Sequence, residues 1–211
     1  MNTNMEVDLD SREEIAKIDI QNVLGSVEAL PDQCRDAWIE ASKVEVPDFY
    51  RDVTNIIMTG MGGSGLGARV IESVFASKLK LPFIRINDYD LPGYTDHHSL
   101  VICSSYSGTT EETIENVRQA IEKKAKWMAL GTGEELINLA KEHNVPYYQI
   151  VPKFNPSNQP RMAIGYSVIG EIILASKAGL FELNQGDVDQ IVQAMMKVQE
   201  ESKVEVHYES N

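Results

Sequence analysis

Short apolar runs alternate along the chain with longer segments in which apolar residues recur every three to four positions. Short runs bounded by turns are typical of buried strands, whereas the longer spacing is typical of one helix face. The runs predict five strands, at residues 54–60, 82–88, 100–105, 126–132 and 145–151. The segments between them predict helices at about 65–78, after "SSYSGTT" and over "EELINLAKEHN". Such alternation predicts a parallel sheet that is covered on both faces.

Further helices are predicted on both sides of this alternating region. Residues 11–43 have the pattern of two helices, the second of which starts at Pro31. Pro160 predicts the first position of a long helix that ends near Gly179, and an amphipathic helix follows at about 187–200. The long helix contains "MAIGYSVIGEIILA", which is apolar on more than one side. We therefore expect it to be buried against the sheet and against another domain or subunit.

The predicted fold class is α/β, a three-layer α/β/α sandwich around a five-stranded parallel sheet with the flavodoxin-like order 2-1-3-4-5. The length of 211 residues suffices for one such domain and leaves little for a second. We expect an N-terminal helical segment at 1–50 that packs on the domain, the domain itself at 51–205, and the start of a linker at 206–211. Strands 1 and 3 are neighbours in this order, and their carboxyl ends flank the point where ligands bind.

Charge and composition exclude several classes of function. The formal net charge of −13 makes nucleic acid and anionic membranes unfavourable partners, although an anionic metabolite can bind where local dipoles or cations outweigh the overall field. Two cysteines and four histidines form no metal-ligand pattern, and Cys103 lies in an apolar run typical of a buried thiol. The acidic N-terminus is unlike a signal peptide, and no apolar stretch is long enough to span a membrane. We expect a cytoplasmic protein.

The first candidate for chemistry is the loop "TGMGGSGLGA", in which Gly60, Gly62 and Gly65 have the spacing G-x-G-x-x-G after a predicted strand. One interpretation is a dinucleotide-binding turn, with Asp88 at the end of the second strand as the ribose-binding acid. Another is a phosphate site, because glycines let backbone N–H groups approach an anion and Ser64 adds a hydroxyl donor. A purely structural tight turn is the third.

The second candidate is "SSYSGTTEET", which follows the third strand and precedes a helix. Thr109 and Glu112 fit a capping box, which accounts for one hydroxyl. The loop has three more, on Ser105, Ser107 and Thr110. A hydroxyl-rich loop at a helix N-terminus suits a phosphate monoester, whereas the dinucleotide interpretation leaves this loop unexplained. We expect the two loops to hold one phosphate between them.

These motifs resemble a known family. "GMGGSG" and "SSYSGTTEET" together resemble the sugar isomerase (SIS) domain, and "NDYDLPGY", "SYSGTTEET" and "QPRMAIGY" resemble the bifunctional phosphoglucose/phosphomannose isomerases over about residues 15–205. The resemblance implies isomerisation of glucose 6-phosphate, and of mannose 6-phosphate, to fructose 6-phosphate through a cis-enediolate, without metal or cofactor. It implies that the sugar phosphate is held by a set of small residues: Gly63, Ser64, Ser105, Ser107 and Thr110. It also implies that Arg161 stabilises the enediolate, and a guanidinium at a helix start suits that role.

The resemblance leaves the acid–base groups unassigned. In that family a histidine that opens the sugar ring and a glutamate that moves the proton come from a second SIS domain. We expect Glu111, Glu112 and Glu115 to be capping or solvated residues, and His97 and His98 to be solvated at the opposite end of the sheet. His143 is predicted to lie on the inward side of its helix, and His207 is not assigned. The chain is thus expected to be the N-terminal half of an isomerase, inactive alone.

Three other functions compete with this one. They are a non-catalytic SIS module that senses a phosphosugar, an NAD-dependent enzyme, and another sugar-phosphate enzyme such as an amidotransferase-type synthase. The expected partners are a hexose 6-phosphate, a second SIS domain and a second copy in a homodimer, since the apolar helix over 162–175 needs a cover.

Overall fold

A computed structural model describes residues 7–210 of the chain. Residues 1–6, where the predicted N-terminal segment begins, and residue 211, where the predicted linker ends, lie outside the described part. Five parallel strands form one sheet in the order β2-β1-β3-β4-β5, which confirms the predicted topology. Their bounds are β1 Asn55–Gly60, β2 Phe83–Ile86, β3 Ser99–Ser104, β4 Lys126–Gly131 and β5 Tyr147–Gln149.

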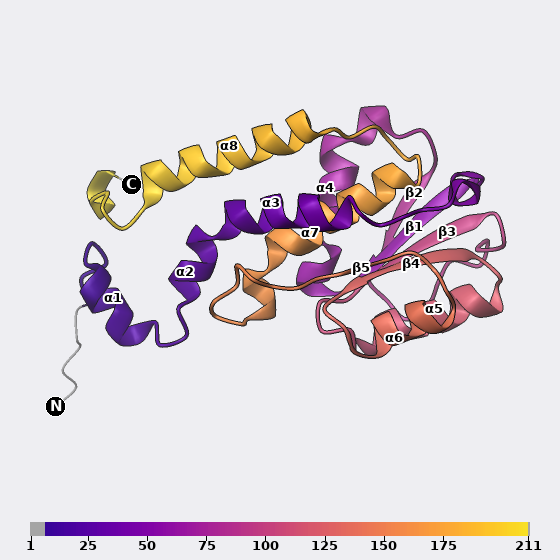
Figure 1. Ribbon diagram of the computed structural model, residues 1–211, viewed down its shortest axis with the longest axis horizontal. Helices are drawn as coiled ribbons and strands as arrows, with labels where there is room; N and C mark the ends of the chain where they lie inside the picture. Colours follow the sequence, from indigo (N-terminus) through magenta and orange to yellow (C-terminus); the bar gives the residue numbers. More distant parts are fainter. Residues whose placement is uncertain (1–6, 211) are drawn as a thin grey trace.

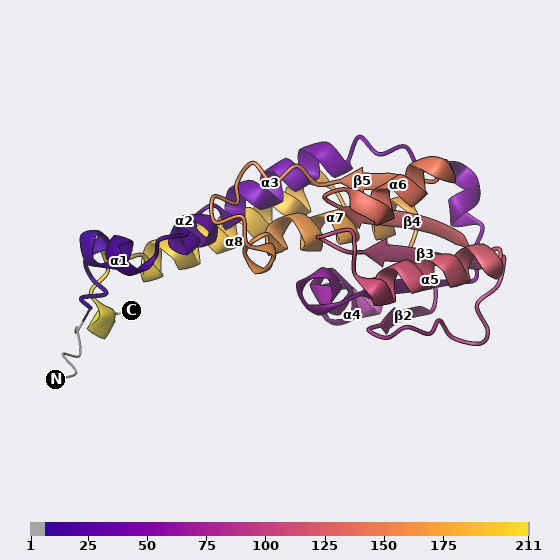
Figure 2. The ribbon, with the colours of Figure 1, turned by 90° about the horizontal axis from the view of Figure 1, so that it is seen from below.

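Helices cover both faces of this sheet, so the three-layer sandwich is also confirmed (Figures 1 and 2). One face carries α5 (Glu111–Glu122) and α6 (Glu134–Glu142). The other carries α4 (Leu66–Val74) and α7 (Ile164–Lys177). Of the remaining long helices, α3 (Leu30–Ala41) lies beside α7, and α8 (Gln185–Ser202) lies beside α3 (Figure 1).

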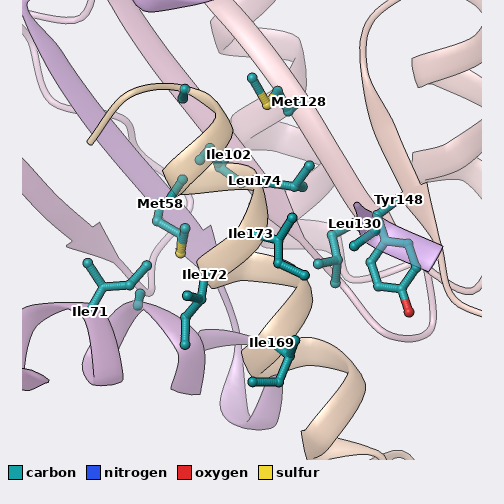
Figure 3. Packing of buried hydrophobic residues seen from close by; sticks show 14 of the residues in the cluster. Met58, Ile71, Ile102, Met128, Leu130, Tyr148, Ile169, Ile172, Ile173 and Leu174 are labelled. Carbon is teal, nitrogen blue, oxygen red and sulfur yellow. The ribbon is translucent and has the colours of Figure 1, made fainter. Parts of the chain in front are cut away.

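Alternation along the strands divides the core in two, because successive side chains of a strand point to opposite faces. On β1, Ile56 and Met58 belong to the cluster under α7, while Ile57 belongs to the cluster under α5 and α6. β3 and β4 alternate in the same way, with Ile102 facing α7 and Cys103 facing α5. Figure 3 shows the first cluster, in which side chains of α7 pack beside those of the sheet: Ile169, Ile172, Ile173, Leu174, Met58, Ile102, Met128 and Leu130.

The long apolar helix α7 is buried on nearly all sides. Besides the sheet, the elements that bury it also belong to this chain. The expectation that another domain or subunit covers it is wrong for most of its length, because α3 and α4 of this chain pack against it. Cys34 and Ala37 of α3 and Ala68 of α4 belong to the same buried cluster as α7. α3, the last helix of the N-terminal segment, is therefore part of the core.

Several predicted boundaries differ from the observed ones because polar residues end helices early. Residues 11–43 form three helices rather than two: α1 (Arg12–Ile18), α2 (Val23–Glu28) and α3. Asp19 separates the first two, because its carboxylate accepts hydrogen bonds from the N–H groups of Val23 and Leu24. Asn22 then caps α2 from a left-handed conformation with φ of 55°.

Short 3₁₀ turns precede two of the helices at positions where one continuous helix was predicted. η2 (Gly62–Gly65) precedes α4, so the helix predicted at 65–78 occupies only part of that range, and η3 (Ala76–Lys78) follows it. η4 (Pro160–Met162) precedes α7, which begins at Ile164 rather than at Pro160. The remaining 3₁₀ turns are η1 (Asp48–Arg51) and η5 (Tyr208–Ser210).

A helical arm made of α1, α2 and the end of α8 extends beyond the sandwich (Figures 1 and 2). α1 has no buried residue, and Arg12 ties it to α2 and to the segment after α8 through ion pairs with Glu28 and Glu205. Exposed ion pairs of this kind contribute little stability. Across residues 7–210, no helix has both the length and the apolar character needed to cross a bilayer.

The central strand β3 carries much of the stability of this fold. We expect Ile102→Ala to lower the free energy of unfolding by about 2–5 kcal/mol, because it removes a fully buried side chain between α7 and the sheet. The matched control is Ile20→Ala, since Ile20 is 88% exposed, and this variant should change stability by less than about 0.5 kcal/mol. Urea titration followed by circular dichroism measures both, and equal midpoints for the two variants would contradict this description of the core.

Candidate functional site

Two loops meet where β1 and β3 end side by side. The two strands pair in parallel, and the last register position places Gly60 opposite Ser104. The glycine loop continues directly from Gly60, and the loop rich in hydroxyls continues directly from Ser104. Parallel strands end at one edge of the sheet, so both loops open onto that edge.

The spacing of the glycines is required by the tight turn itself. A Cβ on Gly60 would lie 2.2 Å from the carbonyl oxygen of Ser64, and one on Gly65 would lie 2.7 Å from the carbonyl oxygen of Gly60. Gly62 has φ of 56°, a conformation that favours glycine. The G-x-G-x-x-G pattern thus has a structural reason that applies with or without a dinucleotide.

Asp88, the candidate ribose-binding acid, is exposed, and its carboxylate accepts a hydrogen bond from the N–H of Tyr89. Asp88 does not line the pocket beside the glycine loop that is described below. Its neighbour Asn87 supports the loop instead, because its amide donates a hydrogen bond of 2.5 Å to the carbonyl oxygen of Gly60.

The N-terminus of α4 is already occupied by a carboxyl group of the protein. Glu171 projects from α7, is completely buried, and accepts a hydrogen bond of 3.0 Å from the N–H of Ala68 at Oε2. Its Oε1 accepts a second, of 2.8 Å, from the hydroxyl of Ser104. A Cβ on Gly67 would lie 2.4 Å from Oε2, so Gly67 is needed for this approach. The dipole of α4 is therefore directed at Glu171, and an external anion has to be held elsewhere.

Burial raises the pKa of Glu171 to about 8, although the hydrogen bonds from Ser104, Ala68 and Gly67 act in the opposite direction. Removal from water disfavours the charged form of a carboxyl more than these three bonds favour it. Near neutral pH, then, the proton on Glu171 lies directly beneath the two loops.

The second loop is organised by hydrogen bonds among its own hydroxyl groups. Ser105 is buried, and its Oγ lies 2.8 Å from Thr110 Oγ1 and accepts a bond from the N–H of Gly108. Gly108 has φ of 76°, and a Cβ there would lie 2.1 Å from the carbonyl oxygen of Gly133. Thr109 in turn donates to the hydroxyl of Ser107. These bonds fix the loop in one conformation.

The predicted capping box between Thr109 and Glu112 is wrong. The N-cap residue of α5 is Thr110, and no side chain caps the helix. The hydroxyls of Thr109 and Thr110 are directed to Ser107 and Ser105 instead, which leaves the first N–H groups of α5 without a side-chain acceptor. Of the two helices that follow the loops, α5 rather than α4 thus has the open N-terminus.

The two loops and the turn before α7 enclose one small polar pocket of about 200 Å³. Four of the predicted ligand residues, Gly63, Ser64, Ser107 and Thr110, line it together with Arg161. Ser105 does not, because its hydroxyl is turned into its own loop. Ser64 links the loops directly, since its Oγ accepts a hydrogen bond of 3.0 Å from the N–H of Tyr106.

Arg161 is held at the pocket by its backbone rather than by its side chain. Gln33 of α3 is completely buried, and its amide nitrogen donates to the carbonyl oxygens of Met162 at 2.7 Å and Phe154 at 2.9 Å. Its oxygen accepts from the N–H of Gly165 at 3.2 Å, so one side chain fixes the end of the turn and the start of α7. The exposed guanidinium of Arg161 makes no hydrogen bond or ion pair with any of residues 7–210.

A larger groove of about 450 Å³ lies elsewhere, between α4 and α8. Its lining is almost wholly apolar and includes Val70, Val168, Ile191 and Met195. Its lining offers an anion only Arg69 and Ser73, and the hydroxyl of Ser73 already donates to the carbonyl oxygen of Arg69, so the smaller polar pocket is the candidate site.

The remaining titratable candidates lie away from the pocket. His97 and His98 are exposed near the start of β3, as expected, and their rings lie 3.9 Å apart. His143 is not on the inward side of its helix, because it caps the C-terminus of α6, is exposed and touches Trp127 at its edge. Glu111 is exposed and accepts a hydrogen bond from the hydroxyl of Tyr89. The described residues contain no group of histidine, cysteine and carboxylate side chains suited to a metal ion.

Sequence reasoning missed several residues that build the site. Met61, Tyr106 and Ser167 line the pocket, and Glu171 and Gln33 support it from below. Glu171 did leave a signal, because it is the one charged residue within "MAIGYSVIGEIILA". A polar residue in such a run has to find a buried partner. Gln33 left none, since a glutamine on an amphipathic helix is typical of a solvated face.

Comparisons with known proteins relate the chain to sugar-phosphate isomerases. No family model matches it. The chain is 36% identical over 187 residues to a bifunctional phosphoglucose/phosphomannose isomerase of Caldicellulosiruptor bescii, an overlap of 88% of this chain and 54% of that protein. It is 35% identical to the Aquifex aeolicus protein of the same name, over 59% of this chain and 39% of that one. The chain thus spans about half the length, or less, of these curated relatives.

Solved structures share the fold at low sequence identity. Tagatose-6-phosphate ketose/aldose isomerase of Escherichia coli has a TM-score of 0.61 at 19% identity, over 87% of this chain and 55% of that one. NanR of Vibrio vulnificus, complexed with ManNAc-6P, has a TM-score of 0.55 at 15% identity, over 89% of this chain and 72% of that one. These similarities concern the fold alone.

The buried Glu171 makes stability depend on pH in a predictable direction. Its pKa is raised from 4.5 to about 8 in the folded state, so the folded protein binds the proton more tightly than the unfolded chain does. The proton on Glu171 therefore contributes fully to the free energy of unfolding below about pH 4.5. This contribution is lost as the pH rises toward 8, at up to about 1.4 kcal/mol per pH unit.

Glu171→Gln should remove this contribution. Urea titrations at a series of pH values between 5 and 8 measure the unfolding free energy of the wild type and the variant. As the pH rises, the wild type should lose stability relative to the variant. Glu142→Gln, at an exposed position on α6, is the control and should follow the wild type. Parallel curves for wild type and Glu171→Gln would show that Glu171 carries no such proton.

Proposed function

We propose, from the premise that this chain contains a SIS-type sugar isomerase domain, that it binds hexose 6-phosphates as part of an aldose–ketose isomerase. The observation that carries the proposal is the unpaired guanidinium of Arg161 beside two hydroxyl-bearing loops and the open N-terminus of α5. In a chain with a net charge of −13, a locally cationic pocket of this size favours a small anion. The names of the relatives suggest glucose 6-phosphate, mannose 6-phosphate and fructose 6-phosphate.

The hydroxyl-rich loop is the proposed anchor for the phosphate group. Ser107 and Thr110 face the pocket, Ser64 faces it from the glycine loop, and Gly63 leaves room for the oxygens. Ser105 is proposed to act indirectly, because its hydroxyl holds Thr110 and Gly108 in place. A phosphate monoester accepts many hydrogen bonds, and bonds to an ionised acceptor are among the strong ones. The anchor would fix the carbon chain of the sugar relative to the rest of the site.

Arg161 is the proposed stabiliser of the reacting part of the sugar. Abstraction of a proton next to a carbonyl group places negative charge on oxygen as the enediolate forms. A guanidinium already held at that place stabilises this charge more than it stabilises the neutral substrate, which lowers the barrier. The clamp from Gln33 to Met162 and Gly165 reduces the reorganisation needed.

The acid and base are proposed to come from outside the pocket described here. Isomerisation needs groups that take up and return protons within hydrogen-bond reach of the sugar. No carboxylate or imidazole of residues 7–210 lines this pocket. We therefore propose that a second SIS domain, like the remaining length of the relatives, supplies a glutamate and a histidine, and that the assembly is a homodimer in the cytoplasm that works without cofactor or metal.

A second candidate function is a regulatory module that senses a phosphosugar. The same observation favours it, because a pocket with an anchor and a cation but no acid or base can bind without turnover. The residues that follow in a longer protein distinguish the two: an enzyme needs a glutamate and a histidine that reach this pocket, whereas a sensor needs an effector domain.

Ligand binding tests the proposed substrate class. Glucose 6-phosphate and fructose 6-phosphate should raise the thermal unfolding midpoint of the 211-residue chain, whereas glucose and NAD should leave it unchanged. Ser107→Ala should weaken hexose 6-phosphate binding by roughly 10- to 100-fold, the range expected for one hydrogen bond to a charged group. Ser73→Ala is the control, because this exposed hydroxyl donates to the carbonyl oxygen of Arg69 on α4. Stabilisation by NAD but not by the sugar phosphates would refute the proposal.

Turnover tests the absence of acid and base groups. The purified 211-residue chain should show no conversion of glucose 6-phosphate to fructose 6-phosphate in a coupled assay, even where calorimetry shows binding. The expected cause is chemical, since the pocket holds the cation but no proton carrier. Isomerisation above the uncatalysed rate that is lost in Arg161→Ala would mean that the acid and base lie within this chain.

A further inference from the structure

Among the serine and threonine hydroxyls that line the pocket, only that of Ser167 has no hydrogen-bond partner within residues 7–210. The hydroxyls of Ser64 and Thr110 are bonded to Tyr106 and Ser105, and that of Ser107 lies within reach of Thr109. Ser167 lines the same pocket from α7. Its side chain makes no hydrogen bond with any of residues 7–210.

The position of Ser167 makes this unusual. The residue is only 3% exposed and lies in the first turns of an apolar helix. Serines in helices commonly donate to a carbonyl four residues earlier, as Ser73 does to Arg69 at 2.7 Å. Ser167 makes no such bond to Ala163. Ser167 Oγ is not among the unpartnered side-chain oxygens that are sealed in the core, so this hydroxyl opens into the pocket, where it can bond a ligand.

The polar groups of the pocket come from two sides. Ser107 and Thr110 belong to the loop after β3, whereas Arg161 and Ser167 belong to the turn before α7 and to α7 itself. If the phosphate is held by the first pair, as proposed above, the second pair faces the carbon chain. The pocket is below the size typical of drug-like ligands, so a short chain fits it.

The two groups on the α7 side have different chemistry. Arg161 can only donate hydrogen bonds, which suits a carbonyl oxygen or an oxyanion. Ser167 can donate and accept, which suits an alcohol. We propose, on the basis of the proposed function, that Ser167 binds one hydroxyl group on the carbon chain of a phosphorylated polyol, and so helps the pocket to select a sugar phosphate over phosphate alone.

Ser167→Ala tests this assignment, because it removes one oxygen and keeps a good helix former of nearly the same size. Titration calorimetry of the 211-residue chain should show that the variant binds glucose 6-phosphate roughly tenfold more weakly than the wild type does. The affinity for inorganic phosphate should be unchanged, since the anchor is intact. Ser73→Ala is the control and should match the wild type for both ligands.

A set of monodeoxy glucose 6-phosphates identifies the hydroxyl. One member should bind the wild type as weakly as glucose 6-phosphate binds the variant, and combining that analogue with Ser167→Ala should cause no further loss. Unchanged affinity of Ser167→Ala for glucose 6-phosphate would overturn this inference and leave the proposed function intact. An equal loss for inorganic phosphate would place Ser167 at the phosphate and also overturn it. Failure of the wild type to bind any hexose 6-phosphate would overturn both.

Discussion

The parallel pairing of β1 with β3 is the constraint on which the site depends. Gly60 lies opposite Ser104 at the last register position, so β1 and β3 end side by side. The loops that follow the two strands are therefore brought into contact. Moving one strand by one residue relative to the other would turn its side chains to the opposite faces of the sheet. The buried alternation of Ile56, Ile57 and Met58 prevents such a shift, so packing in the sheet determines where the loops meet.

Glu171 bonds to the N-terminus of α4, whereas the N-terminus of α5 has no side-chain cap. By bonding to Ala68 and Ser104, it satisfies the start of α4 and joins that helix to the strand end and to α7. A carboxyl with a raised pKa performs this task with little charge near neutral pH, so it does not strongly repel an anion above it. The division of roles between a structural α4 and a receptive α5 thus follows from one side chain.

The strand order and the pairing of the loops could be predicted, because both follow from alternating apolar runs and short-range chemistry. The pocket residues Ser64, Ser107, Thr110 and Arg161 could be proposed because their motifs are local in the sequence. The contributions of Gln33, Ser167 and Glu171 depend on contacts between segments far apart in the chain, such as that between Gln33 and Met162. The capping box failed for the same reason, since the sequence does not say that the hydroxyl of Thr110 is bonded to Ser105.

The amide of Gln33 has a consequence for how this polypeptide can be divided. It lies on α3, within the segment before residue 51, yet it holds the backbone that directly follows Arg161, at Met162 and Gly165. α3 and the sandwich therefore share one core, and a fragment trimmed to residues 51–205 would lose the hydrogen bonds of Gln33 to the turn that carries Arg161. A substitution on α3 would therefore reach the turn that carries Arg161 through a single buried side chain.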